Sequence, residues 1–249
     1  MVRFPKDLYA DVRVETVFST KILLDDFLLK QNKTKTDTGA LVRVFDGTRW
    51  YYGATTDLAR LQEMVDGLAR MATPAQGIDA HPAVARMEAN RGDFRRYADD
   101  SVARVSNADK LALMESYVPV LREAEGILKS RLYYLDRHTE KRFLSSRGAD
   151  LVFDIQQASL SARYTLQGRD APFQEGEDVF ETVFGRLPGR QEKVRGTLRK
   201  DLDYCRNALP VPPGTYTCIL SPLVTGVFAH ESFGHKSEAD FMAGDETMA

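Results

Sequence analysis

The sequence predicts an α+β fold in which a long antiparallel sheet carries helices packed on one side. Residues 9–53 indicate β structure, with alternation at residues 9–17. Residues 127–166 alternate apolar and polar side chains over long stretches, with the period of two that strands require. Residues 58–72, 107–121 and 191–208 instead repeat apolar side chains at spacings of three and four, as helices do. The gaps between the strands of residues 127–166 are too short for crossover helices, so these strands are expected to pair antiparallel.

The N-terminal part of the sheet is predicted to contain a hairpin. Residues 9–17 and 40–45 alternate, and Asp46 and Gly47 supply a turn before the aromatic run at residues 50–52. Residues 30–38 are polar and rich in Lys and Thr. This segment is expected to be either a solvated loop or an exposed strand edge.

Two helices follow in the middle of the chain. Thr56 is the expected N-cap of the first, which ends before Pro74. Pro119 lies inside the second helical pattern and removes a backbone donor, so it must either kink that helix or start another.

A turn is predicted around Asp136, Arg137 and His138, between strands at residues 132–135 and 143–146. His138 would then have a solvated or turn-capping role. The same role is expected for His81, which precedes a proline.

A proline-rich break at residues 210–214 predicts a domain boundary. Residues 1–210 are expected to form the N-terminal α+β domain. Residues 211–249 are expected to begin a second, incomplete domain, with a short strand at residues 215–220 and a helix that starts at Pro222 and carries the histidines.

Charge and composition narrow the function classes. The 249 residues contain 34 Lys and Arg against 36 Asp and Glu, a net charge of -2, which disfavours nucleic acid or an anionic membrane as a partner. The apolar runs are too short to span a bilayer, and Cys205 and Cys218 form no disulfide framework. We therefore expect a cytoplasmic protein with no membrane association.

The residues that indicate chemistry are His230, Glu231 and His235, which form the pattern HExxxH. Neutral imidazoles are common zinc ligands, and a carboxylate beside the first ligand can accept a proton from water that the metal activates. This combination predicts metal-assisted hydrolysis.

The spacing of the two histidines is one residue longer than in HExxH. Residues i and i+5 point roughly 140° apart on a straight α-helix, so His230 and His235 can share a metal only if the winding changes locally. A single π-type turn would bring them to one face, and Gly234 is the residue expected to permit it. Glu238 and Asp240 are candidates for a supporting partner or a further ligand. A hydrogen-bonded surface pair is the alternative that spacing alone leaves open.

The stretch from Val227 to Phe241 resembles the metal-binding signature of the TldD/PmbA family of metallopeptidases, specifically the TldD-type subunit. In that signature HExxxH is followed by a spaced glutamate and an Asp-Phe pair. Residues 9–13, 39–44 and 53–55, and the Pro213-Gly214 lead-in, resemble the N-terminal half of the family in the same order.

This resemblance implies a cytoplasmic peptidase that uses zinc, or another divalent metal, to cut peptides or unfolded proteins inside a dimer. The dimer would form with a second copy or with a paralogous subunit lacking the metal. His230 and His235 would be the metal ligands and Glu231 the general base. The family's third ligand is a cysteine in its C-terminal half, and neither Cys205 nor Cys218 occupies that position. The chain is thus expected to be an N-terminal fragment that is inactive alone.

A second class of function remains open from the sequence. The chain could be a non-catalytic partner or a peptide-binding subunit of a dimeric protease complex. Exposed strands such as residues 30–38 would then receive an extended peptide or the partner by strand addition. Metal analysis distinguishes the two classes, because a partner subunit needs no metal.

Overall fold

The computed structural model of the protein describes residues 2–169 and 171–240. It consists of two units, Met1–Ala208 and Leu209–Ala249. Phe241 of the Asp-Phe pair and the remainder of the expected second domain, residues 242–249, lie outside the described residues.

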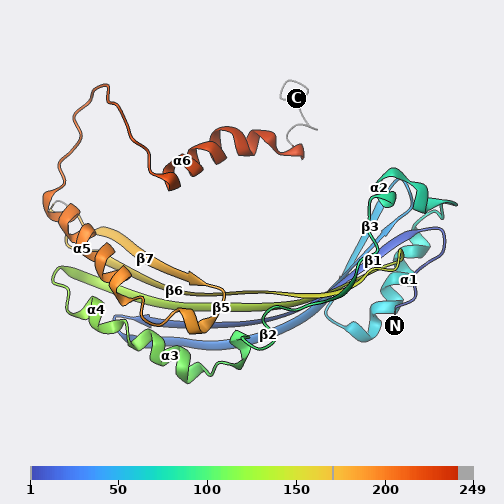
Figure 1. The fold of residues 1–249 in the computed structure, drawn as a ribbon, viewed down its shortest axis with the longest axis horizontal. Coiled ribbons are helices and arrows are strands. Elements are labelled where there is room, and N and C mark those ends of the chain that lie inside the picture. The colour runs from blue at the N-terminus through green and yellow to red at the C-terminus, as the bar shows by residue number, and fades with distance from the viewer. Residues whose placement is uncertain (1, 170, 241–249) are drawn as a thin grey trace. The chain divides into compact units, whose positions relative to one another are not determined.

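The first unit is built on a seven-stranded sheet (Figure 1). Its strands are β1 (Tyr9–Asp25), β2 (Leu28–Phe45), β3 (Trp50–Thr55), β4 (Arg91–Phe94), β5 (Ile127–Ser145), β6 (Asp150–Leu166) and β7 (Phe173–Glu181). The order is β3-β2-β1-β5-β6-β4, and β7 also pairs with β6. Every pairing is antiparallel except that of β4 with β6. The predicted α+β class with a long antiparallel sheet is confirmed.

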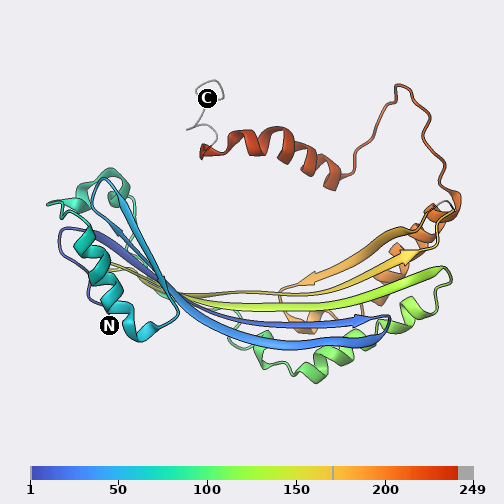
Figure 2. The same cartoon turned by 180° about the vertical axis from the view of Figure 1, so that it is seen from behind.

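Most helices of this unit cover one face of the sheet. The helices of the unit are α1 (Leu61–Met71), α2 (Pro82–Ala85), α3 (Asn107–Glu115), α4 (Val118–Arg122) and α5 (Gln191–Asn207), with 3-10 turns at Leu58–Arg60, Ile78–Ala80, Val102–Arg104 and Phe184–Arg186. In Figures 1 and 2, α3 and α4 lie along the convex side of the curved sheet.

The strand register explains why one face is covered and the other is open. Ile22 of β1 is opposite Tyr134 of β5, which is opposite Leu160 of β6, so even-numbered residues of these strands share a face. All three are fully buried and pack with residues of α3, α4 and α5. Even-numbered residues of β1 and β2 likewise pack on α1. The odd-numbered residues form the face that we call the open face, which is concave in Figure 1.

The exception lies at the end of the sheet where β1 starts. Tyr9 and Phe45, both odd-numbered, are buried together with Ile78 and Val84 of the segment that contains α2. Helices therefore cover one side of the sheet, as predicted, except at this end.

A buried ion pair joins Lys110 of α3 to Asp136 of β5. Lys110 Nζ lies 2.7 Å from Asp136 Oδ2, and both side chains are fully buried. The same ammonium donates to Thr20 Oγ1 at 2.9 Å, and the Thr20 N–H and Tyr134 hydroxyl donate to Asp136. Each charge thus has several polar partners, which a buried ion pair requires.

The predicted turn at Asp136, Arg137 and His138 is wrong, because β5 runs through it without a break. Aspartate favours turns when its side chain bonds to neighbouring backbone, but here Asp136 binds Lys110, and His138 binds Asp154. The chain reverses instead between β5 and β6, at residues 146–149.

Four other expectations have clear outcomes. The β2–β3 hairpin is confirmed, and residues 30–38 form a strand, not a loop. Pro119 lies in the first turn of α4, so it starts a second helix. The expected cap at Thr56 is wrong: Asp57 accepts the Ala59 N–H at 3.1 Å and caps the 3-10 turn that leads into α1.

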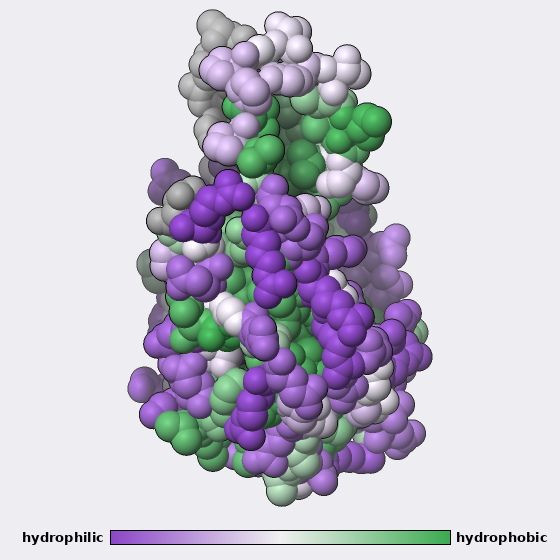
Figure 3. Space-filling view, turned by 90° about the vertical axis from the view of Figure 1, so that its left-hand side faces the viewer, coloured by the Kyte–Doolittle hydropathy of each residue, from purple (hydrophilic) through white to green (hydrophobic). Residues whose placement is uncertain are grey.

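The second unit contains α6 (Pro222–Ala229), a π-helical turn at His230–Gly234 and a 3-10 turn at His235–Ser237. The strand predicted at residues 215–220 is wrong, since this exposed segment pairs with no other strand of the described chain. Exposed hydrophobic side chains occur along α6, among them Leu223 and Phe228, and hydrophobic residues are green in Figure 3. No helix in the described part of the chain is long and apolar enough to cross a membrane.

Candidate metal centre

The helix that carries the histidines begins where the sequence predicts. Ser221 Oγ accepts the Val224 N–H at 3.3 Å, and Pro222 occupies the first turn, where its missing N–H costs nothing. The chain then runs through α6 directly into His230.

The winding changes at the motif itself. Residues His230–Gly234 form a π turn between α6 and the 3-10 turn. The two imidazole rings consequently lie on one side, with their centroids 4.3 Å apart and their planes at 67°. The predicted departure from regular α-helix is confirmed, and with it the convergence of the two rings.

The role expected of Gly234 is not borne out. Its φ of -55° and ψ of -55° are ordinary right-handed values that any residue adopts. A Cβ added there would approach His230 Nδ1 at 3.6 Å, which is normal contact. The π turn therefore does not depend on the conformational freedom of glycine.

Three potential ligand atoms converge at this turn. His230, Glu231 and His235 each offer one atom, and the three atoms lie within 4.8 Å of one another. Glu231 Oε2 is 3.8 Å from His235 Nε2. Two convergent imidazole nitrogens suit zinc, a metal that histidine nitrogens commonly bind, so this part of the donor set fits a metal. The Glu231 carboxylate lies close enough to accept a proton from water held at the same place.

Glu238 supports the second imidazole. Its Oε1 lies 2.6 Å from His235 Nδ1, a hydrogen bond that fixes the ring and leaves Nε2 free as a ligand atom. This is the supporting role considered for Glu238. Asp240, the other candidate, is exposed and does not belong to the convergent group.

The other two histidines have structural roles. His81 Nδ1 accepts the Ala83 N–H at 3.2 Å and caps α2, as expected. His138 lies 3.1 Å from Ser101 Oγ and 3.0 Å from Asp154 Oδ2.

The Ser101–His138–Asp154 chain has the residue types of a hydrolytic triad, and sequence reasoning missed it because its members are distant in the chain. Ser101 is only 7% exposed and also accepts the Ala103 N–H. Burial raises the pKa of Asp154, but hydrogen bonds from His138 and two backbone N–H groups outweigh this effect and hold that pKa below its usual range. The group therefore ties residues 96–103 to the sheet and presents no accessible nucleophile.

The two cysteines lie outside the convergent group. Cys205 is half-buried on α5, where burial raises the pKa of its thiol, and Cys218 is exposed. Neither is among the three residues whose ligand atoms converge.

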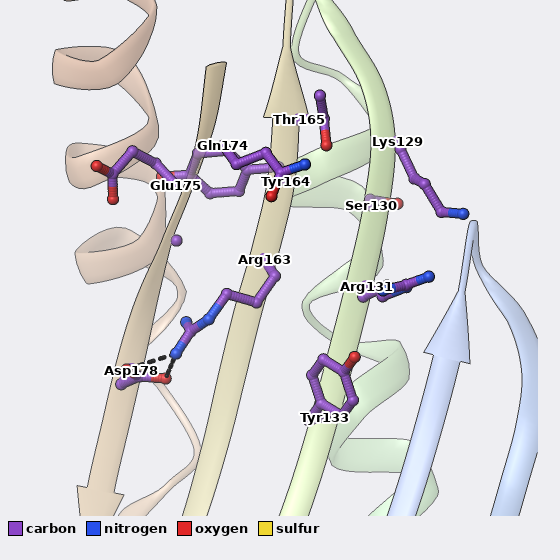
Figure 4. A pocket seen from close by; sticks show the side chains of 11 residues that line it. Lys129, Ser130, Arg131, Tyr133, Arg163, Tyr164, Thr165, Gln174, Glu175 and Asp178 are labelled. Carbon is purple, nitrogen blue, oxygen red and sulfur yellow. Dashed lines mark hydrogen bonds and ion pairs between the residues drawn. The ribbon is translucent and has the colours of Figure 1, made fainter. Parts of the chain in front are cut away.

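A hollow on the open face lies between β5, β6 and β7 (Figure 4). Arg163 reaches across it to Asp178, with 2.7 Å between nitrogen and oxygen, while Lys129 and Arg131 point away. Its lining contains no histidine or cysteine. The hollow therefore lacks the imidazoles that converge at the π turn.

Comparison with known proteins identifies similar sequences. Residues 10–72 match the family model for domain 1 of the PmbA/TldA metallopeptidases. The chain is 26% identical to a metalloprotease of Methanothermobacter thermautotrophicus, over 96% of the chain and 53% of that protein. It is 23% identical to a zinc metalloprotease TldD homolog of Saccharolobus solfataricus, over 93% of the chain and 51% of that protein. The chain thus spans about half the length of these relatives.

Solved structures show the same fold. A protein of Thermotoga maritima described as a modulator of a DNA gyrase superposes with a TM-score of 0.63 at 11% identity, over 83% of this chain and 46% of that one. TldE from Thermococcus kodakarensis superposes with a TM-score of 0.57 at 9% identity, over 79% of this chain and 44% of that one.

Proposed function

The chain belongs to the TldD/PmbA family, and from that premise we propose that the intact protein is a zinc-dependent peptidase. His230 and His235 would hold the metal, and Glu231 would act as general base. The observation that carries this proposal is the π turn, which brings the i and i+5 imidazoles to one side. A surface pair with no shared ligand would need no such change of winding.

Each residue of the motif has a distinct task. Zinc, when bound, polarises a carbonyl and makes water more acidic, which is the chemistry that peptide hydrolysis needs. The Glu231 carboxylate is exposed and adjacent to the first imidazole, so it can accept a proton from water and pass it to the leaving amine. Glu238 holds the His235 ring through Nδ1 and keeps Nε2 available.

The proposal extends to the intact protein because two imidazoles fall short of the three protein ligands of a usual catalytic zinc site. We place the third ligand outside these 249 residues and take the chain as an N-terminal portion that does not hydrolyse peptides alone. The proposed substrates are peptides or unfolded proteins. The proposed assembly is a dimer, with a second copy or with a paralogous subunit.

The test uses the intact protein that contains this chain. Zinc content and hydrolysis of an unfolded protein are measured for the wild type, for Glu231→Gln and for Glu192→Gln, an exposed control on α5. We expect Glu231→Gln to keep its zinc and lose turnover, and Glu192→Gln to resemble the wild type. Unchanged turnover in Glu231→Gln would remove the general-base role.

The alternative is a non-catalytic, peptide-binding subunit of a protease complex. The long unpaired edge of β2 favours it, because an edge of this kind can receive an extended chain. Intact protein that purifies without metal and binds none on addition would support this alternative.

A further inference from the structure

The outer edge of β2 is open over residues 31–39. On its inner side this segment pairs with β1 in unbroken register, and on its outer side β3 begins to pair only at Ala40. No other strand of the described chain adjoins it. Residues 32–37 are all exposed, and the segment contains no proline. In an antiparallel strand every second residue directs its N–H and C=O outward, so this edge offers unpaired backbone groups.

The edge is also held in place from the covered side of the sheet. Asn107, at the start of α3, donates to Asn32 Oδ1 at 2.6 Å and accepts from Thr34 Oγ1 at 3.1 Å. These bonds order the strand before anything binds to it. A pre-ordered edge loses less conformational entropy when another strand is added.

Lysines gather on the open-face side of this edge. Lys33 is directly opposite Lys21 of β1 in the register. Two residues further on, Lys35 is opposite Ser19, which is in turn opposite Arg137 of β5. Four cations therefore occupy two neighbouring rows, although the whole chain has a net charge of -2. Like charges directly opposite one another destabilise a sheet, so sheet stability does not explain this arrangement.

Several other cations of the open face have carboxylate partners, and Arg13 lies over the Phe143 ring. Arg131 pairs with Asp25 at 3.0 Å, and Lys141 pairs with Glu15 at 2.8 Å. Within the described residues, by contrast, Lys21, Lys33 and Arg137 take part in no ion pair. Lys35 pairs with Asp37 at 2.7 Å, but both side chains are more than half exposed and such pairs contribute little.

We propose that the edge of β2 binds an acidic, extended segment of a polypeptide as an added strand, with carboxylates at positions i and i+2 opposite Lys33 and Lys35. The inference deepens the proposed function by naming the class of polypeptide the protein takes. The added strand supplies the missing backbone partners, and its carboxylates neutralise the lysine rows. A second copy of the chain fits poorly, because its own β2 edge would bring further lysines against these.

The experiment measures peptide binding by fluorescence anisotropy at low salt, using the Glu231→Gln chain without metal. The probe is a labelled nine-residue peptide in which glutamate alternates with threonine, and its control has lysine in place of glutamate. We expect only the glutamate peptide to bind, with an affinity that falls in high salt. Equal binding of both peptides overturns the proposal. This binding experiment involves neither metal nor hydrolysis, so a negative result leaves the peptidase proposal untouched. Failure of the peptidase test likewise leaves the binding proposal untouched.

Variants locate the binding site. Lys33→Glu combined with Lys35→Glu is expected to weaken binding of the glutamate peptide at least about tenfold. The control is Arg199→Glu combined with Lys200→Glu, which changes the net charge by the same amount at two exposed positions of α5. This control is expected to leave peptide binding unchanged. Circular dichroism verifies that both variants fold. Equal affinities for the two double variants overturn the assignment to β2.

Three further measurements address the binding mode and the other occupants. A glutamate peptide N-methylated at alternate residues lacks the backbone donors of one edge and is expected to bind weakly. Full affinity of that peptide contradicts strand addition. Competition by a single-stranded oligonucleotide as effective as that of the peptide would make the site a general polyanion surface. A dimer that dissociates on changing Lys33 and Lys35 would make it a self-association edge. Either result overturns the proposal.

Discussion

The two units of the chain differ in where their polar and apolar side chains lie. In the sheet unit, buried carboxylates such as Asp136 and Asp201 have polar partners, and the apolar side chains pack on helices. In the second unit, apolar side chains such as Leu223 and Phe228 are exposed, as are the candidate metal ligands. The comparison teaches that folding stability resides in the first unit and the candidate chemistry in the second. Variants should therefore affect one property without the other.

The largest effect is expected at Lys110. Lys110→Met removes one partner of the buried pair and leaves the Asp136 carboxylate without its counter-charge. We expect a loss of about 3–5 kcal/mol in the free energy of unfolding, measured by urea denaturation. Zinc affinity measured under native conditions should not change. A loss below about 1 kcal/mol would show that the pair contributes little to the first unit.

The next effect is expected where α5 docks on the sheet. The Tyr164 hydroxyl donates to Asp201 Oδ2 at 2.6 Å, and both residues are buried. Tyr164→Phe leaves that carboxylate short of a donor and should cost roughly 1–3 kcal/mol. Tyr204→Phe on the same helix is the matched control, because Tyr204 is 60% exposed. Equal stabilities of the two variants in thermal denaturation would contradict this assignment.

A pH-dependent contribution is expected from Asp46. The backbone N–H of Arg49 donates to the Asp46 carboxylate at 2.7 Å, and Thr48, Tyr51 and Thr73 supply further donors. These hydrogen bonds lower the pKa of Asp46 to about 2, although burial raises it. A lowered folded-state pKa gives stability that is present above the unfolded-state value near 4 and lost as the pH falls toward 2.

The stability difference between wild type and Asp46→Asn should therefore shrink by about 1–2 kcal/mol between pH 5 and pH 2. Denaturation curves at each pH measure it. A difference that stays constant over this range would mean that Asp46 titrates alike in the folded and unfolded chain.

The smallest effect is expected in the second unit. Glu238→Gln weakens the hydrogen bond that orients His235, so zinc affinity should fall about tenfold. Glu192→Gln is the control for the loss of one exposed carboxylate. The unfolding free energy of the sheet unit should not change in either variant. Equal zinc affinities would remove Glu238 from the support of the site.

Some local patterns predicted the local structure. The β2–β3 hairpin, the interruption of the helix near Pro119 and the opening of α6 at Pro222 follow from turn and proline chemistry within a few residues. The π turn was predictable for a different reason. Two residues five apart can meet on a helix only if its winding changes, so a shared ligand implied the turn at His230.

Prediction from the sequence failed where side chains bind partners that are distant in the chain. Asp136 and His138 have the composition of a turn, but Lys110 and Asp154 hold them inside a continuous strand. The Ser101 contact with His138 likewise joins residues 37 positions apart. Such pairings arise only when the sheet assembles, and no local spacing indicates them.

The most direct test of the account is calorimetric titration of the chain with Zn²⁺. The variants are His230→Ala, His235→Ala and their combination. The control is His81→Ala, which removes the cap of α2 and an edge-to-face contact with Phe45 and leaves the second unit unaltered. We expect each single variant to lose at least about tenfold in zinc affinity, the double variant to lose little more, and His81→Ala to resemble the wild type. Wild-type affinity in either single variant would contradict the claim that the two imidazoles of the π turn share one metal.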